Sequence, residues 1–162
     1  ILGAMVSPDA AARVKRMVED AASKGAKLMT GPVQMDGAVL QPVLLDGLTA
    51  EMDLYKEEAF GPVVTVLRAG SDDEAVRLAN DTQYGLSASV FSRDIGRAMA
   101  VAKRIESGIC HINSSTVHDE AQMPFGGVKS SGYGRFGGRA GIAEFTDLRW
   151  ITIQTAHRHY PV

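Results

Sequence analysis

Cys110 is the only thiol in the chain. It stands in an apolar run, between Ile109 and His111, that predicts a strand. A thiol becomes reactive when a helix terminus or a neighbouring cation lowers its pKa, and neither is evident around Cys110. A free cysteine otherwise behaves as a small apolar residue. The sequence therefore predicts a buried, unreactive thiol and no catalytic nucleophile at this position.

Three glycines, Gly132, Gly134 and Gly137, match the spacing of a phosphate-binding loop. Such a loop binds a dinucleotide where it follows a strand and opens a βαβ unit with an acidic residue further on. The sequence around these glycines lacks that context. We therefore reject a phosphate cradle and predict that the glycines provide positive φ angles in a tightly folded loop.

Metal-binding and hydrolytic chemistry also lack their residue patterns. No serine stands in the Gly-x-Ser-x-Gly elbow of an independent hydrolase. The histidines lack the spacing of a zinc site and have no second cysteine to join them. We therefore expect no metal site and no complete set of catalytic residues in this chain. The histidines concerned are His111, His118, His157 and His159.

The composition indicates one ordinary globular unit. The 162 residues are 45% hydrophobic and 22% charged, with a net charge of -2. This near-neutral charge gives no electrostatic reason to expect nucleic acid or a membrane surface as a partner. A single cysteine excludes an internal disulfide and favours a cytoplasmic location. The start on Ile1, without an initiator methionine, indicates a piece cut from a longer chain.

Helix-start signals divide the chain into elements. Helices are predicted over residues 7–24, 71–80 and 94–105, because Ser7, Ser71 and Asp94 can each begin a first turn. A shorter helical segment is expected near residues 138–145. These helices must hold whatever the intervening strands and loops present.

Short apolar runs between the helices predict strands. Strands and helices alternate through the middle of the chain with short connections, which indicates an α/β fold with a mainly parallel sheet and flanking helices. The polar, glycine-rich segment 114–138 is a long loop of the kind that usually has a functional role. The predicted strands cover residues 26–29, 41–45, 63–67, 86–91, 108–113 and 148–155.

Three motifs, taken in order, resemble the aldehyde dehydrogenase superfamily. The first is the run Glu-Glu-Ala-Phe-Gly-Pro-Val at residues 57–63, and the second extends from Asn80 to Leu86. The third is the run from Pro124 to Arg135. Each is short, but their joint order and spacing extend over nearly the whole chain. The run His-Ile-Asn at residues 111–113, followed by Val-His-Asp-Glu at 117–120, is most similar to the aromatic branch, which includes salicylaldehyde, benzaldehyde and vanillin dehydrogenases.

The resemblance implies the C-terminal part of an enzyme that oxidises an aldehyde, and an aromatic one by its branch, to a carboxylic acid with NAD or NADP. In the family a cysteine thiolate attacks the aldehyde, a hydride passes to the nicotinamide, and a glutamate activates water to release the acid. These groups lie upstream of the first motif found here. We therefore expect no catalytic residue in this chain, and the isolated chain should be inactive and bind NAD weakly.

Two cofactor-binding residues carry over from the first motif. By resemblance, Glu58 accepts hydrogen bonds from the hydroxyls of the nicotinamide ribose, a role that suits an acceptor-only carboxylate. Phe60 packs beside that ribose and the nicotinamide. Without the motif, Glu58 would be read as a solvated charge and Phe60 as an ordinary core aromatic.

The substrate-binding residues expected from the resemblance lie in the long loop. Phe125 corresponds to an aromatic residue that lines the substrate tunnel in many members, where a flat apolar wall suits an aromatic aldehyde. His118, Asp119 and Glu120 either contact a ring hydroxyl or form a polar loop in water, and the sequence leaves both open. Asn113 is expected to fix the backbone of the loop instead of touching substrate.

The chain is expected to have three parts: residues 1–146 belong to the catalytic domain, 147–156 form an oligomerisation strand, and 157–162 are a tail. In the family the last strand joins subunits, which implies a homo-oligomer. A different hypothesis is that the chain is a non-catalytic assembly module that pairs through this strand, because exposed strand edges are templates for pairing. Apolar surface left uncovered should make the chain self-associate.

Overall fold

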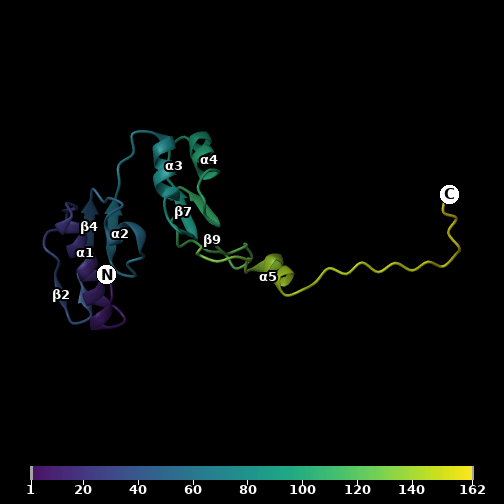
Figure 1. The fold of residues 1–162 in the computed structure, drawn as a ribbon, viewed down its shortest axis with the longest axis horizontal. Coiled ribbons are helices and arrows are strands. Elements are labelled where there is room, and N and C mark those ends of the chain that lie inside the picture. The colour runs from purple at the N-terminus through teal and green to yellow at the C-terminus, as the bar shows by residue number, and fades with distance from the viewer. Residues whose placement is uncertain (1, 162) are drawn as a thin grey trace. The chain divides into compact units, whose positions relative to one another are not determined.

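A computed structural model describes residues 2–161 and divides the chain into two compact units, Ile1–Gln83 and Tyr84–Val162, where the composition indicated one. Both units combine helices with short strands, as Figure 1 shows. The first unit contains α1 (Pro8–Ser23), β1 (Lys27–Leu28), β2 (Met35–Asp36), β3 (Val39–Leu40), β4 (Val43–Asp46), α2 (Asp53–Lys56), β5 (Val63–Val66) and α3 (Asp72–Asn80). The second unit contains β6 (Tyr84–Gly85), β7 (Ser87–Val90), α4 (Ile95–Ala102), β8 (Ile109–Ile112), β9 (Val128–Lys129) and α5 (Gly138–Glu144).

Helix α1 organises the first unit. The side chain of Ser7 accepts a hydrogen bond from the Ala10 amide at 3.1 Å, and Pro8 occupies the first turn, so the predicted start is confirmed. Gly25, with φ of +105°, follows the end of the helix, where a left-handed residue is common. One face of the helix is buried, because its apolar residues recur at helical spacing: Ala11, Val14, Met17, Val18 and Ala21.

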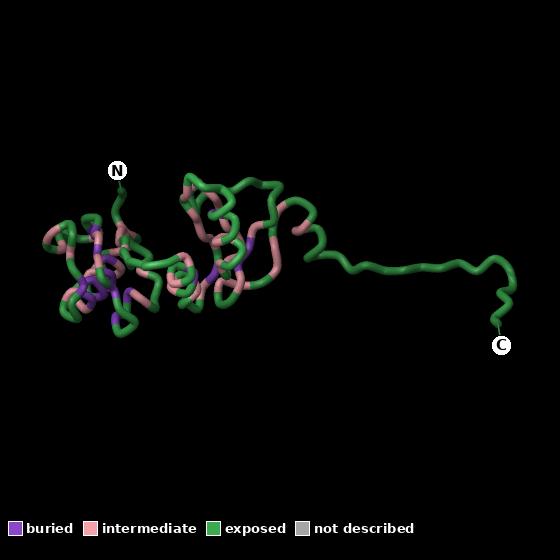
Figure 2. The backbone as a smooth tube through the Cα atoms, turned by 90° about the horizontal axis from the view of Figure 1, so that it is seen from above, coloured by how far each residue is buried: buried purple, intermediate pink, exposed green. Residues whose placement is uncertain are grey.

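A three-stranded sheet packs in the core beside α1. Its order is β1-β4-β5, with β4 antiparallel to β1 and parallel to β5. Leu45 on β4 and Met52, which precedes α2, are fully buried in the same cluster as Val18 of the helix. Figure 2 shows most of the buried backbone in this first unit. Its core therefore gives the loop between α2 and β5 a firm support.

The second unit is built on a β7-α4-β8 crossover. Strands β7 and β8 pair in parallel, with Ser87 opposite Ile109 and Val90 opposite Ile112. Asp94 caps α4 by accepting a hydrogen bond from the Arg97 amide at 3.0 Å, as its position predicted. Such a crossover is the usual connection between parallel strands.

Strands β6 and β9 join the second and third motifs, which are far apart in the sequence. They pair antiparallel, with Gly85 opposite Val128, and the Gly85 amide also donates to Ser131 Oγ at 2.9 Å. The chain at Gly108 runs directly against Gly126, so that a Cβ on Gly108 would collide with the Gly126 carbonyl. Glycine is needed here for close backbone approach.

The sheet content differs from the predicted single, mainly parallel sheet. Residues 2–161 form four small sheets, in which two strand pairs are parallel and three are antiparallel. The α/β class holds. The predicted strand over residues 148–155 is not formed, and this segment is extended and exposed. A strand needs a hydrogen-bonded neighbour, and residues 2–161 of this chain place none beside the segment, so its predicted pairing with another subunit stays a prediction. None of the described helices is long and apolar enough to span a membrane.

Candidate functional site

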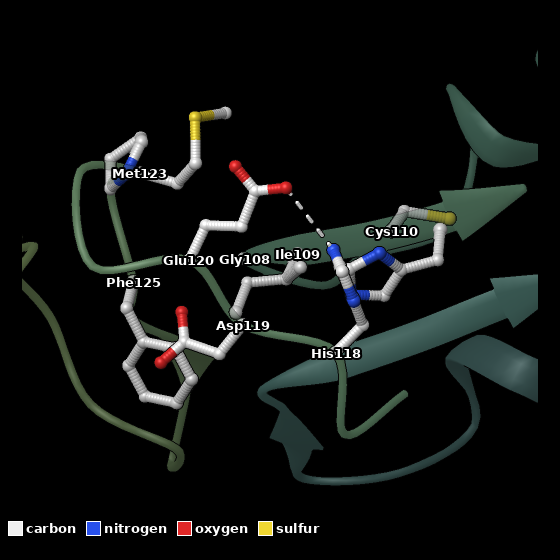
Figure 3. A pocket seen from close by; sticks show the side chains of 10 residues that line it. Gly108, Ile109, Cys110, His118, Asp119, Glu120, Met123 and Phe125 are labelled. Carbon is white, nitrogen blue, oxygen red and sulfur yellow. Dashed lines mark hydrogen bonds and ion pairs between the residues drawn. The ribbon is translucent and has the colours of Figure 1, made fainter. Parts of the chain in front are cut away.

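A pocket with a volume of about 370 Å³ opens in the second unit. One wall is formed by residues 108–111, which lead into and along β8, and the other by residues 118–120 and 123–125 of the long loop. Figure 3 shows the loop side chains arranged around this hollow. Strand β8 supplies a wall built on a regular element, while the loop supplies most of the polar groups.

The four residues predicted to bind substrate all line this pocket. His118, Asp119 and Glu120 are exposed and contribute polar atoms, whereas Phe125 is partly buried and contributes an aromatic ring. Phe125 is held by a two-way backbone bridge to Phe136, with N–O distances of 2.9 and 2.7 Å. The structure therefore brings these four residues together in one place, whereas their binding role stays a prediction.

Hydrogen bonds hold the long loop in place beside the pocket. Ser87 Oγ on β7 donates to the Thr116 carbonyl at 2.9 Å, and the His118 amide donates to the Ser115 carbonyl at 3.2 Å. The Met123 amide donates to the Glu120 carbonyl at 2.9 Å and closes a turn. The polar residues of the loop are thus carried on a backbone that is tied to β7 and to itself.

His118 and Glu120 form a polar pair at the pocket. His118 Nε2 lies 3.4 Å from Glu120 Oε1, and this contact becomes an ion pair when the ring is protonated. Gln122 Nε2 donates to the other carboxylate oxygen of Glu120 at 2.6 Å. The ring of His118 also meets the ring of His111 edge to face, with centroids 5.7 Å apart. The pair can accept or donate a hydrogen bond to a polar substituent on a ligand.

His111 is a pocket residue that the sequence reasoning left out. Its Nε2 atom is buried and has no hydrogen-bond partner among residues 2–161, and the same holds for Ser89 Oγ on the neighbouring strand. These two residues are direct partners in the β7-β8 register. Buried polar atoms usually have a hydrogen-bond partner. His111 Nε2 and Ser89 Oγ can therefore each form a hydrogen bond. The position of His111 within the predicted strand 108–113, next to the loop, was the available signal.

Cys110 also lines the pocket, on β8. Burial raises the pKa of the Cys110 thiol, so the thiol stays protonated and weakly nucleophilic at neutral pH. This agrees with the predicted unreactive cysteine, although the residue is only partly buried. Cys110 therefore contributes an apolar wall to the pocket.

Asn113, at the end of β8, fixes backbone as predicted, but the backbone is that of Ser92 after β7 and not that of the long loop. Its side-chain oxygen accepts from the Ser92 amide at 2.8 Å, and its side-chain nitrogen donates to the Ser92 carbonyl at 2.9 Å. Asn113 itself has φ of +56°, a conformation that asparagine tolerates better than most residues. The side chain fixes backbone and does not line the pocket.

The glycines of the rejected phosphate motif have the backbone that we predicted. Gly132, Gly134 and Gly137 all have positive φ. At Gly137, with φ of +84°, a Cβ would also collide with the Met123 carbonyl. The motif is a folding requirement of the loop behind the pocket.

The two predicted cofactor-binding residues lie in the first unit, in the loop between α2 and β5. Glu58 is exposed. The side chain of Phe60 is also exposed, at 80%, and its φ of +47° lies in the left-handed region, which is rare for a bulky residue. Phe60 is therefore not a core aromatic of this chain, and the alternative interpretation is wrong. Strained backbone of this kind occurs where a side chain is directed toward a ligand.

No three His, Cys, Asp or Glu side chains within residues 2–161 lie close enough together to hold a metal ion. The candidate sites are thus an aromatic and polar pocket in the second unit and an exposed Glu58–Phe60 loop in the first. Both are candidate binding surfaces, and the one cysteine, Cys110, has a raised pKa, which disfavours the nucleophilic thiolate.

This chain, with its α/β units, belongs to the aldehyde dehydrogenase family: the family profile matches residues 1–151. The chain is 59% identical, over all of its 162 residues, to a vanillin dehydrogenase of Pseudomonas fluorescens, and covers 33% of that protein. The chain therefore spans about a third of the length of the curated relatives it matches.

Solved structures are similar as well. A salicylaldehyde dehydrogenase from Pseudomonas putida G7, complexed with salicylaldehyde, superposes with a TM-score of 0.90 at 49% identity, over 99% of this chain and 33% of that one. A succinic semialdehyde dehydrogenase from Streptococcus pyogenes, in complex with NADP+ as the cofactor, gives a TM-score of 0.87 at 37% identity, over 94% of this chain and 34% of that one.

Proposed function

We propose that this chain is the C-terminal third of an NAD(P)-dependent aldehyde dehydrogenase that oxidises an aromatic aldehyde to its carboxylic acid. The observation that carries the proposal is the gathering of Phe125, His118, Asp119 and Glu120 around one pocket. An aromatic wall beside polar groups suits a ring that carries a hydroxyl substituent. The similarity to vanillin and salicylaldehyde dehydrogenases supports the same substrate class.

The residues of the first unit fit a dinucleotide. When bound, NAD(P)+ would take up the hydride released as the aldehyde is oxidised. Glu58 offers an exposed carboxylate that can accept hydrogen bonds from both ribose hydroxyls, and Phe60 offers an exposed ring face for the ribose and nicotinamide. The cysteine nucleophile and the glutamate base belong to the upstream part of the proposed enzyme. The cysteine forms the thioester intermediate.

We further propose that residues 1–146 belong to the catalytic domain, that residues 147–156 pair with another subunit and that residues 157–162 are a tail. We also propose that the protein works in the cytoplasm. Leu148, Trp150 and Ile153 are exposed on the segment that follows α5. Exposed apolar side chains on an extended segment favour pairing with a sheet edge. The alternative of a pure assembly module uses the same segment without catalysis.

The test is turnover by the full-length protein with vanillin, salicylaldehyde, benzaldehyde and a short aliphatic aldehyde, followed as reduced NAD or NADP. We expect the aromatic aldehydes to be preferred. Phe125→Leu should raise KM for aromatic aldehydes while leaving KM for the dinucleotide unchanged. Phe136→Leu is the matched control, because Phe136 shares the backbone bridge with Phe125 but does not line the pocket. Absence of turnover with every aldehyde would defeat the proposal and favour the assembly module.

A further inference from the structure

The loop that carries Glu58 and Phe60 is anchored at both ends. The Glu57 amide donates to the Asp53 carbonyl of α2 at 2.9 Å, and the Pro62 carbonyl accepts from the Val43 amide of β4 at 2.9 Å. Between these points Ala59 packs against the core, whereas its two neighbours, Glu58 and Phe60, are exposed. The exposure of Glu58 and Phe60 therefore depends on how Ala59, between them, is held.

Arg13 of α1 holds that middle point. Its Nη2 donates to the Ala59 carbonyl at 2.6 Å, and its Nη1 lies 3.1 Å from Met17 Sδ on the next turn of the same helix. The side chain is partly buried. A short hydrogen bond from a charged donor is stronger than a neutral one, and a guanidinium has a fixed donor geometry.

The Ala59 carbonyl matters because it belongs to the peptide plane that immediately precedes Phe60. The φ angle of Phe60 is the rotation about its N–Cα bond relative to that plane, and its value of +47° is unfavourable for an aromatic residue. Such a conformation persists only where the surroundings enforce it. By fixing the direction of the Ala59 carbonyl, Arg13 restricts the orientation of the peptide plane that precedes Phe60. The exposed side chain of Phe60 is placed relative to that plane.

Gly61 lets the same loop lie flat on α1. A Cβ at Gly61 would be 3.0 Å from Val14 Cγ2 and 3.3 Å from Met5 Cε, closer than ordinary contacts. Val14 is fully buried and cannot move aside cheaply. Helix α1 therefore supports the loop twice, through a hydrogen bond before Phe60 and through close packing after it.

We propose that Arg13 is a positioning residue for the dinucleotide: its bond to the Ala59 carbonyl sets Phe60 in the left-handed conformation and so directs Glu58 and Phe60 toward the nicotinamide ribose. This inference rests on the proposed function. Arg13 contacts neither substrate nor cofactor, and acts through the loop that it holds.

The experiment compares Arg13→Met and Arg13→Lys in the full-length protein, by fluorescence titration with NADH or NADPH and by steady-state kinetics. We expect Arg13→Met to weaken dinucleotide binding by roughly tenfold, because a loop that has lost its charge-assisted hydrogen bond must be ordered when the dinucleotide binds. KM for the dinucleotide should rise, while KM for the aldehyde stays unchanged. Arg13→Lys keeps a charged donor and should recover part of the affinity.

Arg16→Met is the matched control, since Arg16 lies on the same helix and is exposed. We expect it to bind the dinucleotide like the wild type. If Arg13→Met also binds like the wild type, the positioning role is overturned while the proposed function stands. If the wild-type protein neither binds a dinucleotide nor oxidises an aldehyde, the proposed function itself fails.

A second pair of variants keeps the test decisive if Arg13→Met does not fold. Gly61→Ala should weaken dinucleotide binding, because its Cβ pushes the loop away from Val14. Adding Val14→Ala removes the methyl groups in contact and should restore affinity relative to Gly61→Ala alone. Equal dinucleotide affinity in Gly61→Ala and the wild type, or no recovery in the double variant, would overturn support of the loop by α1.

Discussion

Cys110 shows how surroundings set the reactivity of a single side chain. Burial raises the pKa of its thiol, so we expect iodoacetamide to label the folded chain more slowly at neutral pH than the chain unfolded in guanidinium. The labelling rate should rise with pH through a midpoint above that of an ordinary thiol. Because Cys110 is the only cysteine, Cys110→Ser should abolish labelling. Equal rates in the folded and unfolded chain would contradict this prediction.

The same shift has a consequence for stability. A pKa that is raised in the folded state favours folding only while the thiol is protonated. The contribution of Cys110 is therefore fully present below the pKa of the unfolded thiol and is lost as the pH rises through the raised value. Cys110→Ala should remove this alkaline dependence from urea unfolding midpoints.

At Phe60, we expect one substitution to have opposite effects on the stability of the fold and on dinucleotide binding. A left-handed aromatic residue costs about 1–3 kcal/mol, whereas glycine adopts this conformation without steric cost. Since Phe60 is 80% exposed, Phe60→Gly loses little buried area. We expect Phe60→Gly to raise the free energy of unfolding by roughly 1 kcal/mol, allowing for the added flexibility of the unfolded chain, while weakening dinucleotide binding in the full-length protein. A lower urea midpoint would show that the ring stabilises the fold.

At the scale of elements, the contact between the start of β8 and the loop behind the pocket depends on a missing side chain. Gly108→Ala should destabilise the chain by roughly 1–3 kcal/mol, as overpacking commonly does, because its Cβ meets the Gly126 carbonyl. Gly141→Ala, inside α5, is the control: its surroundings are open, and alanine favours a helix by about 1 kcal/mol over glycine. Thermal unfolding should separate the two variants in opposite directions.

The elements also mark the boundary between what the sequence predicts and what it does not. The helix starts at Ser7, Ser71 and Asp94 were predictable, because a cap is formed by residues three positions apart. The pairing of β6 with β9 was not, since Tyr84 and Lys129 are separated in sequence by β7, α4, β8 and the long loop, and each strand has only two residues. Pairings of this kind are decided by tertiary packing, which leaves no local period in the sequence.

The candidate site followed the same division. Family resemblance singled out His118, Asp119, Glu120 and Phe125, which line one pocket, and their binding role stays a prediction. It did not identify His111, whose buried Nε2 atom is a property of packing, nor the left-handed backbone of Phe60. Residue type and order thus predicted which side chains gather, whereas their strain and hydrogen bonding required coordinates.

At the scale of the whole molecule, the extended segment after α5 makes the chain prone to associate. We expect the isolated 162-residue chain to be inactive with aldehydes and to self-associate, because its apolar side chains face water. Trp150, the only tryptophan, is 91% exposed and reports on this directly. Its emission should shift to the blue as concentration rises, in step with light scattering. Deletion of residues 147–162 should reduce the scattering, and a clean monomer at high concentration would contradict the prediction.

Among residues 2–161, those that line the aromatic pocket come from one continuous stretch, which β6 and β9 tie together at its two ends. The Glu58–Phe60 loop belongs to the other unit. A single crossover near residue 84 in the gene would therefore exchange the pocket between two homologous enzymes and leave the loop intact. The pocket of this chain can thus be exchanged as one cassette, by recombination as well as by point substitution.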